Sequence, residues 1–306
     1  VISRFVEQGA RLGVREGTAR QIALTLIRES VDAQSTLPKP SKPKEVLVIG
    51  GAGKMGSWMC RYLRSRGHRP VVCDVVRSAD FPNASSLESA ASTSDFIIVA
   101  TPISVARKCL KRLIDLHPSA TLFDISSIKT PVMPVLKEAV KEGISACSVH
   151  PMFGPDTESI FNRNIIMCDC GSEAATDAAT ELLNWGGARM IRMRIEDHDV
   201  LMACVLGLSH AVNIAFFDAL TKTGIDYATL ENVASTTFRK QAGTSRDVAF
   251  ENPELYYEIQ HLNPENNRAL ELLARSIKEI GQAASSEDRR LLTEIMENGK
   301  KYFGGD

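Results

Sequence analysis

The stretch Glu45-Val-Leu-Val-Ile-Gly-Gly-Ala-Gly-Lys-Met-Gly-Ser-Trp58 decides the fold. A short run of apolar, mostly β-branched residues breaks into glycines and then continues as an amphipathic segment, which predicts a strand, a tight turn and the start of a helix. The glycines follow the G-x-G-x-x-G spacing of dinucleotide-binding loops, in which they permit the turn, the approach of a pyrophosphate and helix-on-strand packing. The predicted cofactor-binding residues here, at the amino end of the helix, are Gly51, Gly53, Lys54, Met55 and Gly56.

A second strand, 70–74, is predicted after one helix and the turn at Gly67. Asp74 ends this strand about 20 residues past the glycines, where a carboxylate can hydrogen-bond a ribose 2′-hydroxyl. This position favours NAD as the cofactor over NADP, although Arg77 nearby could hold a 2′-phosphate. Glycine triplets alone also occur in ordinary turns, so the two flanking strands are what support the cofactor interpretation.

Further strands and helices alternate up to about residue 195, which predicts an α/β fold with a doubly wound, Rossmann-type parallel sheet. One apolar strand, 95–102, ends in Thr101 and Pro102. Ligands bind at the carboxyl ends of such strands, so both residues are candidates for the wall of the cofactor site, and their alternative interpretation is simple strand punctuation. A later strand, 120–124, leads into the turn 125–129 at the same edge.

His150 ends another apolar strand, 145–150, and Pro151 restrains it from the far side. Its imidazole titrates near neutrality, which suits accepting a proton from an alcohol while hydride leaves the same carbon. The alternative is a buried histidine with a structural role only.

From Glu196 onward the pattern predicts helices only, and the segment 200–220 is nearly all apolar or small. A helix that is hydrophobic all round is buried on every side, which predicts a subunit interface and a homodimer built through the carboxyl-terminal helices. His210 lies inside this segment and must find a partner or a ligand. Arg239 and Arg246 follow seven residues apart, on similar faces of a helix, where solvated surface arginines are the alternative.

The predicted organisation is a helical remnant at 1–37, a Pro- and Lys-rich linker at 38–45, a dinucleotide-binding domain at 46–195 and an all-α dimerisation domain at 196–306. Lys plus Arg (36) balances Asp plus Glu (37), which argues against nucleic acid or a membrane surface as partner and favours a small-molecule substrate. Seven scattered cysteines indicate a reducing, cytoplasmic environment without a metal site. We also expect no apolar run to reach the roughly 18 residues that a membrane span requires.

Near the amino terminus, Gly9-Ala-Arg-Leu-Gly-Val14 and Leu26-Ile-Arg-Glu-Ser-Val-Asp-Ala-Gln34 resemble the last part of the helical chorismate mutase family. In that family the glutamine matching Gln34 contacts the substrate. The long first helix of the family has no counterpart here, so the resemblance implies a truncated mutase end without mutase activity.

His150-Pro-Met-Phe-Gly-Pro-Asp156, together with the glycine loop and Leu208-Ser-His-Ala-Val212, closely resembles the prephenate dehydrogenase family, from about residue 46 to the carboxyl end. With the mutase-like end, the chain is similar to fused chorismate mutase and prephenate dehydrogenase proteins. The resemblance implies an oxidoreductase of tyrosine biosynthesis, which uses NAD to convert prephenate into 4-hydroxyphenylpyruvate and carbon dioxide.

Carried over by motif, the resemblance makes His150 the base toward the ring hydroxyl and Ser127 a contact of histidine, hydroxyl and nicotinamide. It makes His210 part of the substrate pocket and Arg246 the group that binds a substrate carboxylate, with Arg239 as its rival. Three alternatives stay open: an arogenate dehydrogenase, a chorismate mutase, which Gln34 motivates and which would require the missing helix to be supplied, and a non-catalytic dinucleotide-binding module that would have no use for His150.

Overall fold

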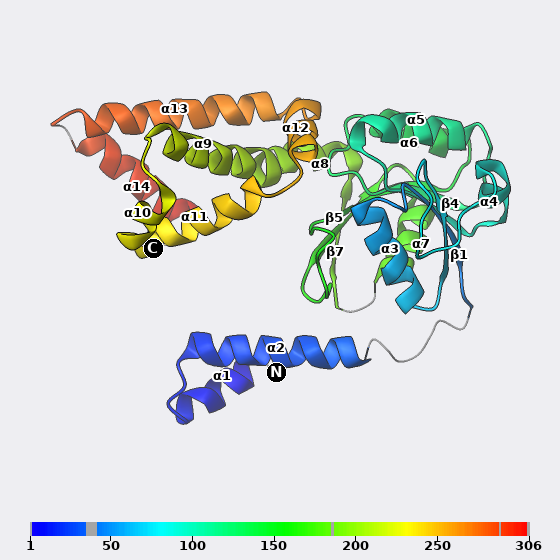
Figure 1. Ribbon diagram of the computed structural model, residues 1–306, viewed down its shortest axis with the longest axis horizontal. Coiled ribbons are helices and arrows are strands. Elements are labelled where there is room, and N and C mark those ends of the chain that lie inside the picture. Colours follow the sequence, from blue (N-terminus) through cyan, green and yellow to red (C-terminus); the bar gives the residue numbers. More distant parts are fainter. Residues whose placement is uncertain (1, 35–41, 185–186, 288, 305–306) are drawn as a thin grey trace. The chain divides into compact units, whose positions relative to one another are not determined.

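The computed structural model describes residues 2–34, 42–184, 187–287 and 289–304, without the side chains of 31–34. The chain divides into two compact units, Val1–His198 and Asp199–Asp306. Figure 1 labels the helices α1 to α14 and several of the strands.

Two helices, α1 (Ile2–Arg11) and α2 (Glu16–Gln34), pack against each other at the amino-terminal end of the first unit. The turn between them uses Gly13 at a φ of 75°, in the left-handed region that favours glycine. Gly9 lies so close to Ala19 that a Cβ on Gly9 would be 2.8 Å from the Ala19 Cβ. The side chain of Gln34, which the mutase resemblance singled out, lies outside the described residues.

A seven-stranded sheet in the order β2-β1-β3-β4-β5-β6-β7 forms the centre of the first unit. Its strands are β1 (Glu45–Ile49), β2 (Arg69–Cys73), β3 (Phe96–Val99), β4 (Thr121–Asp124), β5 (Ala146–Pro151), β6 (Asn164–Asp169) and β7 (Arg189–Arg194). This mostly parallel sheet confirms the predicted α/β, Rossmann-type fold. One pair differs: β6 runs antiparallel to β5. The reason is that residues 152–163 contain no helix, and a parallel return needs a longer crossover.

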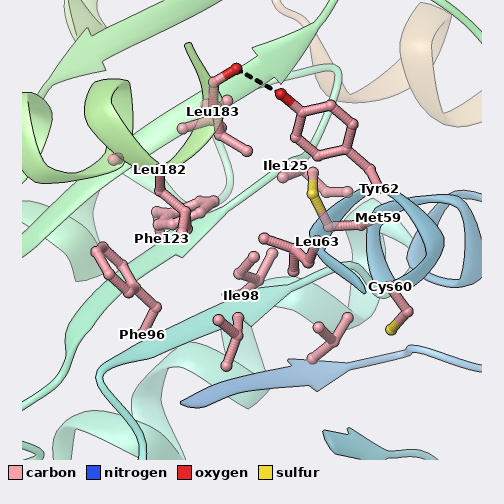
Figure 2. Packing of buried hydrophobic residues seen from close by; sticks show 14 of the residues in the cluster. Met59, Cys60, Tyr62, Leu63, Phe96, Ile98, Phe123, Ile125, Leu182 and Leu183 are labelled. Carbon is pink, nitrogen blue, oxygen red and sulfur yellow. Dashed lines mark hydrogen bonds between the residues drawn. The ribbon is translucent and has the colours of Figure 1, made fainter. Parts of the chain in front are cut away.

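Helices cover both faces of this sheet (Figure 1). They are α3 (Lys54–Ser65), α4 (Leu87–Thr93), α5 (Ile103–Ile114), α6 (Met133–Lys141) and α7 (Glu173–Leu183). Figure 2 shows the hydrophobic core that α3 and α7 form with the sheet, in which Leu63 and Leu182 pack with Phe123 of β4. The Tyr62 hydroxyl donates a hydrogen bond of 2.9 Å to the carbonyl of Leu183, so the two helices are also joined directly.

After β7 the described chain is helical only, as predicted. The elements are α8 (Ile195–Met202), the π-helix η1 (Ala203–Leu208), α9 (Ser209–Lys222), α10 (Tyr227–Asn232), α11 (Thr236–Ala249), α12 (Pro253–Leu262), α13 (Asn266–Ala284) and α14 (Arg290–Tyr302). α9 packs against α11, and η1 packs against α12 and α13. The boundary between the two units falls inside α8, between His198 and Asp199.

The apolar helical stretch from α8 to α9 bears on two predictions. Val200, Val205 and Val212 are 53%, 51% and 37% exposed, so a single chain does not bury the segment on every side, and this exposure is compatible with the predicted subunit interface. Ile195–Lys222 is also long and apolar enough to cross a membrane by length and composition, because it contains an 18-residue window with a mean hydropathy of 2.0. The expectation that no apolar run reaches the length of a membrane span was wrong. The few uncharged polar residues in this helix do not lower its mean hydropathy below that of a membrane span.

All seven cysteines are free thiols. Cys60, Cys147, Cys168 and Cys170 are buried, and burial raises the pKa of the Cys60 thiol to about 12. Cys204, in η1, is exposed.

Candidate active site

The glycine loop between β1 and α3 is as tight as its spacing predicts. Gly50 has a φ of 80°, and a Cβ there would lie 2.6 Å from the Ala100 carbonyl oxygen at the end of β3. A Cβ on Gly56 would lie 2.1 Å from the Gly50 carbonyl oxygen, so only glycine allows α3 to approach the loop this closely. The first N–H groups of α3, at Lys54, Met55 and Gly56, have no acceptor within the helix and suit the pyrophosphate of a dinucleotide.

Asp74 directly follows β2 and is hydrogen-bonded to the glycine loop. Its carboxylate accepts hydrogen bonds from the N–H groups of Ala52 (2.9 Å) and Val76 (3.3 Å). Thr101 and Pro102 follow β3, and the Thr101 nitrogen would lie 3.0 Å from a Cβ on Gly50. The structure therefore brings the predicted cofactor residues together at one edge of the sheet, with a cradle that fits a dinucleotide.

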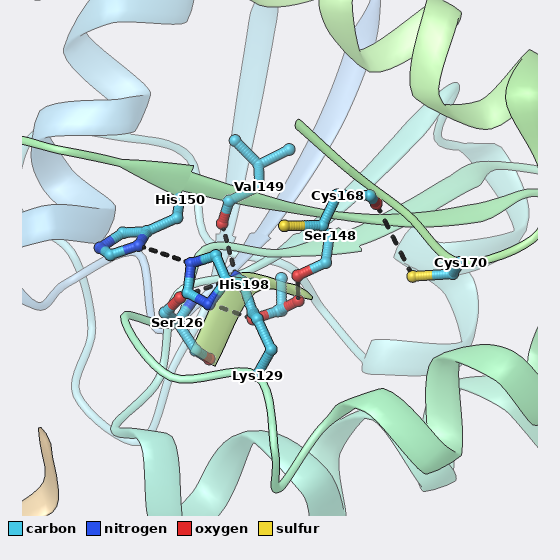
Figure 3. Close-up of polar contacts among 9 residues, drawn as sticks. Ser126, Lys129, Ser148, Val149, His150, Cys168, Cys170 and His198 are labelled. Carbon is cyan, nitrogen blue, oxygen red and sulfur yellow. Dashed lines mark hydrogen bonds and ion pairs between the residues drawn. The ribbon is translucent and has the colours of Figure 1, made fainter. Parts of the chain in front are cut away.

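His150, near the end of β5, is 3% exposed and forms a pair with a second histidine. Its Nδ1 lies 2.9 Å from Nε2 of the fully buried His198 in α8 (Figure 3). Burial lowers the pKa of His150 well below its usual value, and the positive charge of Lys129 and the neighbouring His198 lower it further. When Nδ1 donates the bond to His198, the Nε2 of His150 carries the free lone pair that a general base needs.

A buried ion pair holds the backbone next to His150. Lys129 Nζ lies 3.3 Å from Asp124 Oδ2 and donates to the carbonyls of Ser126 (2.7 Å) and Val149 (2.8 Å), with both charged side chains at most 1% exposed (Figure 3). Asp124 also accepts hydrogen bonds from the Ser126 N–H and the Ser148 hydroxyl. This network ties the turn after β4 to β5, one residue before the imidazole.

Sequence reasoning missed Asp124, Lys129 and His198. The available signal was a charged pair five residues apart in an otherwise uncharged strand and turn, and a histidine beside Asp199 at the start of an apolar helix. Ser127 lies half-buried on the same turn as Lys129, and among the described residues no hydrogen bond joins it to His150.

His210 and Arg246 belong to the second unit. The His210 ring in α9 stacks on Tyr256 of α12, with centroids 4.3 Å apart and planes at 25°. Burial lowers the pKa of His210, and its buried Nδ1 has no hydrogen-bond partner among the described residues. Arg246 and Arg239 in α11 are both exposed, and the guanidinium carbon of Arg246 lies 5.9 Å from the centre of the Phe250 ring.

A polar network fixes α11 on α9 between these residues. The Asn213 Oδ1 accepts hydrogen bonds of 2.9 Å from the Ser245 hydroxyl and from Gln241 Nε2. Asn213 follows His210 by less than one helical turn, and Ser245 directly precedes Arg246. The second unit therefore presents both predicted substrate-binding residues from two helices that are joined to each other.

Residues 63–192 match the family model described as prephenate dehydrogenase, nucleotide-binding domain, and residues 194–298 match prephenate dehydrogenase, dimerization domain. The chain belongs to the prephenate dehydrogenase family. The family assignment makes it an oxidoreductase and confirms the resemblance seen in the sequence.

The proteins similar to this chain have names that mention different substrates. A "probable arogenate/prephenate dehydrogenase" of Methanocaldococcus jannaschii is 29% identical over 85% of this chain, and the chain spans 61% of that protein. A "T-protein" of Enterobacter agglomerans is 24% identical over 97% of this chain and 79% of its own length. A "4-amino-4-deoxyprephenate dehydrogenase" of Streptomyces pristinaespiralis is 28% identical, covering 84% of this chain and 90% of that protein.

Solved structures share the fold. Prephenate dehydrogenase from A. aeolicus, in complex with hydroxyphenyl propionate and NAD+, aligns with a TM-score of 0.66 at 21% identity over 86% of this chain and 98% of its own. Arogenate dehydrogenase from Synechocystis aligns with a TM-score of 0.63 at 22% identity over 84% of this chain and 99% of its own.

Proposed function

We propose that this chain catalyses the NAD-dependent oxidative decarboxylation of prephenate to 4-hydroxyphenylpyruvate, a step of tyrosine biosynthesis. The observation that carries the proposal is His150: a buried imidazole with a lowered pKa, held through Nδ1, at the sheet edge that also carries the glycine loop. NAD, when bound, accepts the hydride from the ring carbon that bears the hydroxyl.

In this mechanism His150 Nε2 takes the proton of the ring hydroxyl. Its lowered pKa keeps the imidazole neutral at neutral pH, so it is ready to accept a proton. The carbonyl formed at that carbon draws electrons from the bond to the ring carboxylate, and aromatisation drives the loss of carbon dioxide. Ser127 contacts the hydroxyl, His210 lines the substrate pocket, and Arg246 holds a substrate carboxylate with the two parallel hydrogen bonds that a guanidinium can make.

For the cofactor, NAD is preferred to NADP because Asp74 places a carboxylate at the end of β2, where a 2′-phosphate would be repelled. Gly51, Gly53, Lys54, Met55 and Gly56 hold the pyrophosphate, with Thr101 and Pro102 as the neighbouring wall. The active protein is a homodimer through its carboxyl-terminal helices, which the description of the second family model and the exposed apolar side chains of α8 and η1 support. A cytoplasmic location stays a prediction.

The second candidate is an arogenate dehydrogenase, in which the side-chain keto group of the substrate is an amine. Its support is the mixed naming of the relatives, one of which carries both substrates in its name. The reacting ring is the same in both substrates, so His150 would serve either reaction.

The deciding experiment follows NADH at 340 nm with purified protein and either prephenate or arogenate, with NADP run in parallel. We expect turnover with prephenate and NAD. His150→Gln should lower kcat by roughly 10²- to 10⁴-fold, the usual contribution of a general base, with little change in KM. His117→Asn, at an exposed histidine with a φ of 44° that asparagine tolerates, is the control. Full activity of His150→Gln would contradict the role of His150 as the base, whereas a wild type without turnover on either substrate would leave the non-catalytic module as the better interpretation.

The carboxylate-binding arginine is tested separately. Arg246→Ala should raise the KM for prephenate by roughly tenfold or more, because a charge-assisted hydrogen bond to the substrate is lost, while Arg239→Ala leaves it near the wild-type value. The reverse ranking would assign the role to Arg239.

A further inference from the structure

The helix that carries His210 changes its winding directly before that residue. η1 (Ala203–Leu208) is a π-helical segment between α8 and α9, and His210 is the second residue after it. Segments of this kind are rare and occur frequently at functional sites. One extra residue in a turn rotates every following side chain by about 100° relative to an uninterrupted α-helix, which has 3.6 residues per turn. The winding of η1 therefore decides which way His210 faces.

Side-chain amides from the α12–α13 region bind one carbonyl before η1 and one carbonyl within it. Asn263 Nδ2 donates a hydrogen bond of 2.8 Å to the Asp199 carbonyl, which lies before the segment. Gln260 Nε2 donates a hydrogen bond of 2.8 Å to the Gly207 carbonyl, at its end. Asn263 is 1% exposed, so its bond forms away from water, where an unmade hydrogen bond is costly.

A third amide, from Asn266, explains the glycine in η1. A Cβ on Gly207 would lie 2.1 Å from Asn266 Oδ1, so this close approach of α13 requires glycine. Asn266 is 1% exposed, and its Nδ2 donates to the carbonyls of Ile259 (2.8 Å) and Gln260 (3.2 Å) at the end of α12. Asn266 therefore joins the end of α12 to the start of α13 directly against η1.

The helix that supplies Gln260 also contacts the His210 ring. Tyr256 and Gln260 are four residues apart and lie on one face of α12, while Gly207 and His210 are three residues apart on the opposing segment. Tyr256 stacks on His210, and Gln260 binds the Gly207 carbonyl. The same face of α12 thus holds both the end of the π segment and the imidazole that follows it.

We infer that Gln260, Asn263 and Asn266 are positioning residues that keep η1 in its π form, so that His210 stays stacked on Tyr256 and turns its Nε2 toward the substrate. This inference rests on the proposed role of His210 in substrate binding. Without the amides the segment rewinds toward an α-helix, and His210 rotates off Tyr256.

The test uses the isosteric variant Gln260→Glu, which removes the donor to Gly207 and keeps the size of the side chain. Gln282→Glu, the same change at an exposed position of α13, is the matched control. The first readout is the ¹H–¹³C NMR spectrum of histidine-labelled protein without substrate, with His210 assigned by its disappearance in His210→Asn. In the wild type, we expect the ring current of Tyr256 to move the chemical shifts of the His210 ring away from their usual values. This change in chemical shift should shrink in Gln260→Glu and stay the same in Gln282→Glu.

The second readout is the steady-state rate with prephenate and NAD. We expect kcat/KM to fall roughly ten- to a hundredfold in Gln260→Glu, mainly through KM, because a binding group is displaced. Asn263→Asp removes the donor at the other end of η1 and should give the same pattern, so it serves if Gln260→Glu fails to fold. His210 signals that coincide with the wild type in both folded variants would overturn the inference. A wild type that turns over no substrate would defeat the proposed function, yet the NMR result would still decide the positioning role.

Discussion

At the scale of single residues, the site depends on polar groups held in dry surroundings. His150 and His198 are both buried, and the neighbouring Lys129 and Asp124 are at most 1% exposed. Such groups are stable only as a connected set, because removing one partner leaves the other desolvated and unpaired. Burial and the neighbouring groups therefore help to keep the imidazole of His150 neutral, in addition to its ordinary pKa.

This gives a prediction for pH dependence. The pKa of His150 is lowered by burial, by Lys129 and by His198, so the acidic limb of the kcat/KM profile should lie below pH 6.5. His198→Asn removes one lowering influence and should move that limb to higher pH. The free energy of unfolding should fall as the pH drops below 6.5, because the unfolded chain then binds a proton that the folded chain excludes. An acidic limb of the wild-type kcat/KM profile at or above pH 6.5 would contradict this prediction.

The position of a residue in the fold was predictable from the sequence where it follows from the local pattern. His150 and Asp74 stand at the ends of strands, and strand ends can be read from a run of apolar residues. His198 was not predictable in the same way, because it lies 48 residues from His150 and meets it only through tertiary packing. The roles of His150, Asp74, Ser127, His210 and Arg246 in catalysis and binding stay predictions.

At the scale of elements, the backbone of α3 packs directly against the backbone of the glycine loop, with no side chains between them. α3 approaches the loop so closely that the Gly50 carbonyl occupies the place of a Cβ on Gly56. Gly53 differs, because it is exposed, it caps α3 in an extended conformation, and its Cβ would lie 3.3 Å from the same oxygen.

These two glycines therefore make a matched pair of variants. Gly56→Ala should lower the free energy of unfolding by about 1–3 kcal/mol, as overpacking does, and should also weaken NAD binding. Gly53→Ala should cost less than about 1 kcal/mol in stability while still weakening NAD binding, because the second glycine of this motif is expected to allow the backbone to approach the pyrophosphate. Urea unfolding and calorimetric titration with NAD measure the two effects. Equal destabilisation by both variants would refute the close-approach argument.

Most elements followed from periodicity, and the exceptions have physical causes. The antiparallel β6 depends on the absence of a helix in residues 152–163, which the sequence pattern did not make decisive. η1 could not be predicted, because its apolar sequence suits an α-helix equally well and only the distant amides of Gln260 and Asn263 distinguish the two windings.

At the scale of the whole molecule, one chain leaves apolar surface uncovered. Val200, Leu201 and Val205 are each about half exposed on α8 and η1, although contiguous apolar surface is normally covered in soluble proteins. The family model that matches this region is described as a dimerization domain. In the proposed homodimer, a second copy of the chain would cover this surface.

Light scattering after size exclusion should accordingly give twice the chain mass of 33.5 kDa. Leu201→Glu combined with Val205→Glu should shift the protein toward the monomer, because two charges would have to be buried without partners. Val75→Glu, at a fully exposed valine of the first unit, should leave the mass unchanged. A wild-type protein of monomeric mass would remove the dimer proposal.

The uneven burial of the thiols makes the protein suitable for site-directed labelling without prior mutagenesis. Cys60, Cys147 and Cys170 combine burial with raised pKa values, so they carry almost no thiolate at neutral pH and should resist alkylation in the folded state. Cys204 is exposed in η1, beside Val205. A maleimide fluorophore should attach there first, and its emission would then report on rewinding of η1 and on the meeting of two chains in real time.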